Sequence, residues 1–193
     1  MVDEIELSDR RPTPRGGSPS QNFFFDRAHN IILSLVDRQE RPRTILDVGC
    51  GTGGLLRKAK ILFPSAELIG IDPEKGSVEV ARRLLPGATF YVSGAESLPL
   101  ADASIDLALS TFSFHHWPAQ EQGLRQIARV LRPGSRLLLA DLWPPFGLSK
   151  FTRHFWPSDP RRVLEMFARG GLVVRAQPRR MSRFLVITIG ERS

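Results

Sequence analysis

The stretch ILDVGCGTGGL, residues 45–55, decides the fold of this chain. It begins inside a short apolar run, Thr44 to Val48, which follows charged residues and a proline and therefore predicts a buried strand. Four glycines occur in the next six residues, and residues 55–59 predict a helix. Because glycine permits positive φ and leaves room for a ligand against the backbone, this strand, turn and helix are typical of nucleotide binding.

A carboxylate at the end of this strand narrows the kind of ligand. Asp47 would repel the phosphates of a dinucleotide, whereas it suits a ligand with a cationic or amino-acid end. The run DVGCGTG, residues 47–53, resembles motif I of the class I S-adenosylmethionine (SAM)-dependent methyltransferases. We therefore expect Asp47, Gly49, Cys50 and Gly51 to bind the methionine end of SAM. The alternative is an ordinary turn without a ligand.

Length and composition indicate a single globular domain. The chain has 193 residues, of which 41% are hydrophobic, which suffices for a sizeable core. No apolar run approaches the roughly 18 residues that a membrane span needs, and the N-terminus lacks the apolar core of a secretory signal. One cysteine excludes an internal disulfide and a cysteine-rich metal site. We expect a cytoplasmic protein.

The order of the predicted elements indicates a doubly wound α/β fold. Residues 1–20, rich in Pro, Gly, Ser and Arg, predict a flexible tail, and residues 21–193 predict the domain. A helix over 21–40 is a candidate lid, as is the aromatic connection over 142–157; a core-covering role is the alternative. Strands are expected at 44–48, 67–72, 89–92, 105–109, 136–141, 172–176 and 184–189, and helices at 54–62, 74–85, 119–132 and 160–169.

Alternating strands and helices predict a mainly parallel sheet with helices on both faces, and the short last turn, over 177–183, predicts one antiparallel strand. The family resemblance implies the order 3-2-1-4-5-7-6, with strand seven antiparallel. In such sheets a ligand binds beyond the carboxyl ends of the strands where the order reverses, here between strands one and four.

Two further loops are expected to complete the cofactor site. Asp72, which ends the second strand 25 residues after Asp47, is placed to accept the ribose hydroxyls, and Pro73 beside it is also expected to bind the cofactor. The alternative, compatible with the first, is a helix cap at Asp72 with Pro73 at the first helical position. The loop from Ser93 to Pro99 resembles the family segment G-D-A-x-x-L-P, which lines the adenine. Gly94 stands where the family most often has Asp, so the backbone of Ala95 and Glu96 is expected to replace its contacts.

The fourth strand is followed by the candidate catalytic residues. The segment STFSFHHW, which starts at Ser110, resembles motif IV of the small-molecule branch, and the pattern of DNA amino-methyltransferases is absent from it. Ser110 is expected to contact the cofactor, and a neutral imidazole of His115 or His116 could remove a proton from the acceptor. The alternative is that one histidine caps the next helix and the other packs. No ligand spacing indicates zinc, and Asp141 has no evident metal partner.

The positive charge lies at the C-terminal end. The net charge is +7, and residues 142–193 carry ten basic and three acidic side chains, whereas the remainder is balanced. The predicted sheet brings much of this charge to the ligand edge, namely Lys150, Arg153, Arg179, Arg180 and Arg183. This suits an anionic substrate, a lipid surface or RNA, and the neighbouring aromatics suit an apolar or aromatic group. A solvated basic face is the alternative.

The resemblance implies transfer of the methyl group of SAM, with S-adenosylhomocysteine as the product. We expect a small-molecule acceptor of the quinone, lipid or natural-product type. Two alternatives stay open: an RNA methyltransferase that uses the basic C-terminal part, and a SAM-binding factor without catalysis. The sequence does not choose the accepting atom or the oligomeric state.

Overall fold

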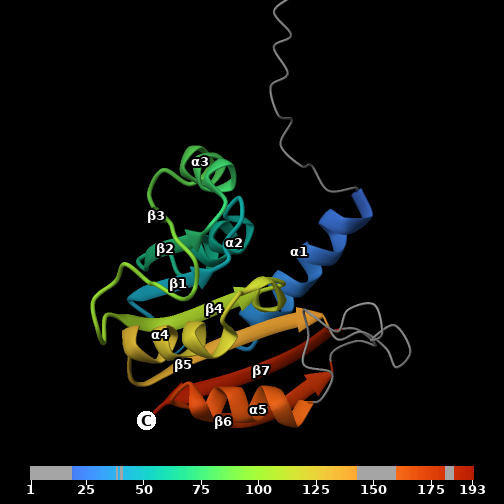
Figure 1. The fold of residues 1–193 in the computed structure, drawn as a ribbon. Helices are drawn as coiled ribbons and strands as arrows, with labels where there is room; N and C mark the ends of the chain where they lie inside the picture. Colours follow the sequence, from blue (N-terminus) through green and yellow to red (C-terminus); the bar gives the residue numbers. More distant parts are fainter. Residues whose placement is uncertain (1–18, 38, 40, 143–159, 181–184) are drawn as a thin grey trace, which may run out of the picture.

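The computed structural model describes residues 19–37, 39, 41–142, 160–180 and 185–193 (Figure 1). Several predictions fall wholly or mostly outside these residues: the flexible tail over 1–20, the aromatic connection over 142–157, and the placement of Lys150, Arg153 and Arg183.

Helices and strands alternate from the first strand to the fifth, except that a loop joins the third strand to the fourth, as the sequence predicts. The strands are β1 (Thr44–Val48), β2 (Glu67–Asp72), β3 (Thr89–Val92), β4 (Ile105–Thr111), β5 (Leu131–Leu142), β6 (Leu172–Arg180) and β7 (Leu185–Arg192). The helices are α1 (Pro19–Ser34), α2 (Gly54–Leu62), α3 (Lys75–Leu84), α4 (Gln120–Val130) and α5 (Pro160–Arg169), and a short 3-10 helix, η1, spans Phe114–His116.

The seven strands form one sheet in the order β3-β2-β1-β4-β5-β7-β6. The pairs from β3 to β5 are parallel, and β7 is antiparallel to both of its neighbours. This confirms the predicted fold class, including the antiparallel seventh strand. The carboxyl ends of β1 and β4 therefore diverge toward helices on opposite faces, which leaves a crevice at that edge.

Helices cover both faces of the sheet (Figure 1). Helices α1, α2 and α3 bury apolar residues against one face, around Ile32, Leu55 and Leu56. Helices α4 and α5 cover the other face, around Leu124, Ile127 and Phe167. Strand β1 is buried along its whole length, because it lies inside the sheet between these two layers.

Three boundaries differ most from the sequence predictions. Helix α1 ends at Ser34 rather than at residue 40, and its last turn tightens with hydrogen bonds to the third residue back. Strand β5 starts at Leu131, because Leu131 pairs with Ile105 and residues 132–135 bulge out of the ladder. Strand β6 continues through the predicted turn to Arg180. A register shift beside Pro178 permits this extension, because β6 is an edge strand and the N–H that proline lacks removes no hydrogen bond from the sheet.

Candidate cofactor and acceptor site

The turn after β1 is shaped by hydrogen bonds and by three glycines with positive φ. The N–H groups of Gly49 and Cys50 both donate to the carbonyl of Ile71, at 2.7 and 3.0 Å. Gly49 has a φ of 78°, and an added Cβ would overlap Ser113 Cβ and Oγ. Gly49 is therefore required both by its backbone conformation and by the loop that follows β4.

Ser113 joins this turn to β4, a role that the sequence analysis missed. Its hydroxyl donates to the carbonyl of Val48 at 2.9 Å and accepts the indole N–H of Trp117 at 3.2 Å. The Ser110 hydroxyl lies 2.8 Å from the Ser113 hydroxyl, and Ser110 is buried. Ser110 thus stabilises the loop, and it does not line the cavity described next, so its predicted cofactor contact stays a prediction.

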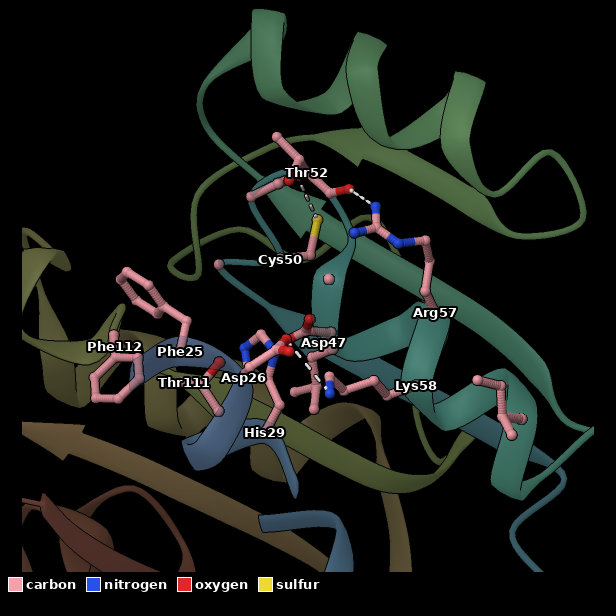
Figure 2. A pocket seen from close by; sticks show the side chains of 15 residues that line it. Phe25, Asp26, His29, Asp47, Cys50, Thr52, Arg57, Lys58, Thr111 and Phe112 are labelled. Carbon is pink, nitrogen blue, oxygen red and sulfur yellow. Dashed lines mark hydrogen bonds and ion pairs between the residues drawn. The ribbon is translucent and has the colours of Figure 1, made fainter. Parts of the chain in front are cut away.

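A cavity of about 800 Å³ opens beside the glycine turn (Figure 2). Its walls come from the turn after β1, the start of α2, the end of β4 and helix α1. The lining residues are Phe25, Asp26, His29, Asp47, Gly49, Cys50, Gly51, Thr52, Gly54, Leu55, Arg57, Lys58, Ile61, Thr111 and Phe112. Four of the predicted cofactor residues meet here, namely Asp47, Gly49, Cys50 and Gly51.

Asp47 is a buried carboxyl group at the base of this cavity. Its side chain is fully buried, and its Oδ1 has no hydrogen-bond partner among the residues that the structure describes. Burial, together with the nearby charge of Asp72, raises the pKa of Asp47 to about 8. A cationic group of a ligand would supply the missing partner and favour the ionised carboxylate.

Asp72 connects the ends of β1 and β2. Its Oδ2 accepts the N–H of Gly51 at 2.8 Å, and its Oδ1 accepts the N–H of Glu74 at 2.9 Å. The predicted capping role is wrong, because α3 begins at Lys75 and Glu74 caps it by accepting the N–H groups of Gly76 and Ser77. Pro73 consequently precedes the cap, and the ribose role of Asp72 stays a prediction.

The loop after β3 lies outside the lining of this cavity. Ala95 is buried against Gly123 of α4. The Glu96 carboxylate folds back over Gly94 and accepts the N–H of Ala119, at the start of α4, with a distance of 3.2 Å. Because Gly94 has no side chain, it leaves the space that the Glu96 carboxylate occupies. The adenine contacts predicted for Gly94, Ala95 and Glu96 stay predictions.

Helix α1 supplies a wall that the sequence analysis described only as a candidate lid. The ring of Phe25 packs edge-to-face on Phe112, with centroids 4.9 Å apart. Lys58 of α2 forms an ion pair with Asp26 at 3.4 Å and donates to Asn30 Oδ1 at 2.9 Å. These contacts fix α1 beside the start of α2 (Figure 2).

His29 lies on the same face of α1 and was also missed. Its Cε1 lies 3.3 Å from the position of a Cβ on Gly54, and its Nδ1 is buried with no partner among the described residues. Burial, together with the charge of Lys58, lowers the pKa of His29 to about 4, so the imidazole is neutral at pH 7. Its spacing of four residues from Phe25 was the available signal, because it places both side chains on one helix face.

The two candidate catalytic histidines differ in their surroundings. His115 Nδ1 lies 2.8 Å from Asp141 Oδ1, and the backbone N–H of His115 donates to Asp141 Oδ2 at 3.1 Å. The His116 ring lies 3.9 Å from that of His115 and is more exposed, and partial burial lowers its pKa. Neither caps α4, whose N-cap residue is Ala119. From the sequence, Asp141 was considered only as a metal ligand, so this contact was not predicted.

Two features are absent from the part of the chain that the structure describes. No group of three or more His, Cys, Asp or Glu side chains in this part of the chain is arranged to hold a metal ion. None of the helices resolved there has the length and apolar character needed to cross a membrane.

The backbone places the basic end of β6 at the cavity edge of the sheet. Arg179 pairs with Ile187 of β7, which also pairs with Ala140 of β5, and Arg180 pairs with Val186, opposite Asp141. The backbones of Arg179 and Arg180 therefore lie level with the carboxyl end of β5, as the sequence analysis expects.

Comparisons with known proteins agree on the family and the fold. Residues 46–139 match the family model described as a methyltransferase domain. The chain is 34% identical over 104 residues to a demethylmenaquinone methyltransferase of Thermotoga maritima, an alignment that covers 54% of this chain and 45% of that protein. It is 44% identical over 104 residues to the O-methyltransferase cnsE of Penicillium expansum, which covers 51% and 37% respectively. The chain thus spans less than half the length of both relatives.

A solved structure with a similar fold is the PH0226 protein from Pyrococcus horikoshii OT3. The TM-score is 0.75 at 16% sequence identity, and the match covers 92% of this chain and 93% of that one. At this identity the likeness concerns the fold alone, and it extends over the N-terminal helix and the C-terminal strands as well as the central part.

Proposed function

Because this chain belongs to the class I SAM-dependent methyltransferases, we propose that it transfers the methyl group of SAM to a small-molecule acceptor and releases S-adenosylhomocysteine. One observation carries the proposal for this particular chain. The cavity beside the glycine turn contains the buried carboxyl group of Asp47, whose Oδ1 has no partner among the described residues. SAM brings an ammonium group to such a site.

The methionine end of SAM is a zwitterion, and the cavity offers opposite charges for its two groups. Asp47 receives the ammonium group, because the positive charge compensates the buried carboxylate. The carboxylate of SAM then faces the start of α2, where the helix dipole and the side chains of Arg57 and Lys58 are favourable to an anion. The buried Nδ1 of His29 lies in the same wall and can take part in this contact as a hydrogen-bond donor.

The nucleoside extends from the turn toward the ends of β2 and β3. Asp72 accepts only one backbone N–H on each oxygen, and each carboxylate oxygen can accept a further hydrogen bond. The two ribose hydroxyls are donors of the right kind. The adenine then lies along the loop from Gly94 to Glu96, where backbone groups make its polar contacts because the Glu96 carboxylate accepts the N–H of Ala119 instead.

The acceptor enters on the side of the cavity that α1 and β4 line. Phe25 and Phe112 form an apolar corner there, which supports a flat or apolar acceptor. The names of the relatives, which include a demethylmenaquinone methyltransferase and a fungal O-methyltransferase, support a small molecule over a macromolecule. The position of Arg179 and Arg180 on the same sheet edge supports an anionic group on that molecule.

Calorimetric titration of the purified chain with SAM and with S-adenosylhomocysteine tests the cofactor site. We expect both to bind, and Asp72→Ala to weaken binding about 100-fold, because two hydrogen bonds to a charged acceptor are lost. Asp102→Ala is the matched control, since Asp102 is an exposed carboxylate that pairs with Arg129, whereas Asp72 contacts the glycine turn through Gly51. Equal affinities for the two variants would remove Asp72 from the ribose site.

Incubation with methyl-labelled SAM tests the transfer. A cell extract is separated after the reaction into small molecules, lipids, RNA and protein, and the label in each fraction is measured. We expect label in the small-molecule or lipid fraction. Label in RNA would instead support the RNA alternative, and cofactor binding without label in any fraction would support a non-catalytic SAM-binding factor.

A further inference from the structure

Asp141 contacts His115 at two points, through both of its carboxylate oxygens. Oδ2 accepts the backbone N–H of His115 at 3.1 Å, and Oδ1 lies 2.8 Å from the ring Nδ1. The Asp141 side chain is buried to 1% exposure, whereas the His115 side chain is 19% exposed. A buried carboxylate at this distance from Nδ1 requires a donor there, because two acceptors would repel each other. Nδ1 therefore carries a proton, and in the neutral ring the lone pair is on Nε2.

The register of the sheet places this pair next to residues that line the cavity, although neither Asp141 nor His115 is itself part of the lining. Thr111 and Phe112 line the cavity, and Phe112 donates its N–H to the carbonyl of Ala140 at 2.9 Å. Asp141 is the next residue on β5, and His115 lies three residues after Phe112 on the loop after β4. Asp141 and His115 thus belong to the ends of β5 and β4. The methyl group of SAM must lie beside these strand ends if Asp47 binds the ammonium group of SAM.

The neighbouring His116 is in a different situation. It adjoins His115 in the chain and lies against its ring, with centroids 3.9 Å apart. The carboxylate of Asp141, however, is hydrogen-bonded to the ring and the backbone of His115. The fold therefore favours His115 over His116 as the candidate base, a distinction that the adjacent pair His-His in the sequence does not reveal.

We propose that Asp141 is a positioning residue that holds His115 with the lone pair on Nε2, and that His115 uses Nε2 to accept a proton from the group that is methylated. This rests on the proposed methyl transfer. It narrows the acceptor to one that loses a proton, which means a hydroxyl group or an acidic carbon.

A bond forms between the acceptor oxygen or carbon and the methyl carbon, and the bond from that carbon to the sulfonium sulfur breaks, which leaves a neutral thioether. The acceptor proton moves to Nε2, and the resulting imidazolium is stabilised by the Asp141 carboxylate. The proton leaves to solvent before the next turnover.

Asp141→Asn tests the positioning role without changing the shape of the side chain. The Asn oxygen would accept the backbone N–H of His115, so its NH₂ group would donate to Nδ1 and move the ring proton to Nε2. ¹⁵N NMR of the imidazole distinguishes the two tautomers and needs no acceptor. We expect the Nδ1–H form in the unmodified protein and the Nε2–H form in the variant. His116→Gln assigns the signals, and Asp102→Asn is the matched control. An unchanged tautomer in Asp141→Asn would overturn the positioning role.

The transfer rate tests the catalytic part. With the labelled fraction of the extract as acceptor, we expect Asp141→Asn and His115→Gln each to lower the rate about 100-fold, and the double variant to be no slower than either. The SAM affinity of all three should change less than about threefold. Thermal unfolding and SAM titration check that each variant is folded.

Rates within about threefold of the unmodified enzyme, or a labelled product in which the methyl group is on an atom that bore no proton, would overturn the catalytic part. If no fraction of the extract is labelled, the proposed function fails and the catalytic part fails with it. The tautomer measurement is independent of that outcome, so the two failures are distinguishable.

Discussion

Asp47 combines two properties that are normally incompatible: its carboxyl group is completely buried, and its Oδ1 has no donor among the described residues. Its pKa of about 8 lies above the ordinary value of 3.8, so the unliganded protein carries a proton there at pH 7. The same shift means that the contribution of Asp47 to folding stability declines as the pH rises from about 4 toward 8. In this range the unfolded chain has already released the proton that the folded protein still holds.

The affinity for SAM should therefore depend on pH. An ammonium group favours the ionised carboxylate, so binding below pH 8 releases the proton of Asp47. We expect the affinity to rise up to tenfold per pH unit between about pH 6 and 8 and to level off above. Calorimetric titration at several pH values checks this. In Asp47→Asn the affinity should be low and flat over this range, and a variant that retains the slope would show that another group titrates.

Gly49 lines the cavity and is also required for folding. An alanine there would combine a φ of 78° with an overlap of its Cβ with Ser113. We expect Gly49→Ala to lower the free energy of unfolding by more than about 3 kcal/mol in urea titration. The control is Gly51→Ala, where φ is 51° but no atom lies within 4 Å, so that only about 1–2 kcal/mol is expected. Equal losses would mean that the contact with Ser113 is unimportant.

At the scale of elements, α1 has two roles that its sequence does not separate. Its C-terminal half buries Ile32 and Leu33 in the core, whereas Phe25, Asp26 and His29 of its first part line the cavity. The first part is fixed to α2 mainly through Lys58, which contacts Asp26 and Asn30. A core element and a cavity wall are thus joined in one helix.

Removing the charge of Lys58 should loosen only the cavity part. We expect Lys58→Met to lower the free energy of unfolding by less than about 1 kcal/mol, because the pair is partly exposed. Amide hydrogen exchange in the first half of α1 should accelerate, and exchange near Ile32 should not. Lys60→Met is the control, since Lys60 contacts the Pro64 carbonyl instead of α1. Uniform exchange along α1 in both variants would contradict the division.

The elements themselves were largely predictable, and the exceptions depend on contacts between strands. The buried β1 and the glycine turn follow from apolar periodicity and from glycine, which are properties of neighbouring residues. The bulge in β5 depends on the pairing of Leu131 with Ile105, and the extension of β6 depends on its place at the sheet edge. Both depend on a partner strand, which a single segment of sequence does not specify.

The site was predictable to the same extent. Asp47, Gly49, Cys50 and Gly51 meet in the cavity because they belong to one short motif. The contacts of His115 with Asp141 and of Ser113 with Val48 join residues 26 and 65 positions apart, and they depend on the order of the strands. His29 was missed because helix α1 reaches the cavity only by packing on α2.

For the whole molecule, a ligand that binds only the folded state must raise its thermal stability. At a SAM concentration 100 times the dissociation constant, the added stability is about 2.7 kcal/mol, which corresponds to a rise in Tm of about 5–10 °C at this chain length. A thermal shift assay checks this. Adenosine at the same concentration, which lacks the amino acid, should give a much smaller rise, and equal rises would argue against the role of Asp47.

The position of the single cysteine has a practical consequence. Cys50 is buried at the turn, and an added Cβ on Gly70 would lie 2.9 Å from its sulfur. Burial raises the pKa of the Cys50 thiol, and the charges of Asp47 and Asp72 raise it further, so the closed protein presents almost no thiolate to an alkylating reagent. Alkylation of Cys50 requires that the turn first separates from β2. The rate of alkylation therefore reports how often the glycine turn opens, and bound SAM should lower this rate.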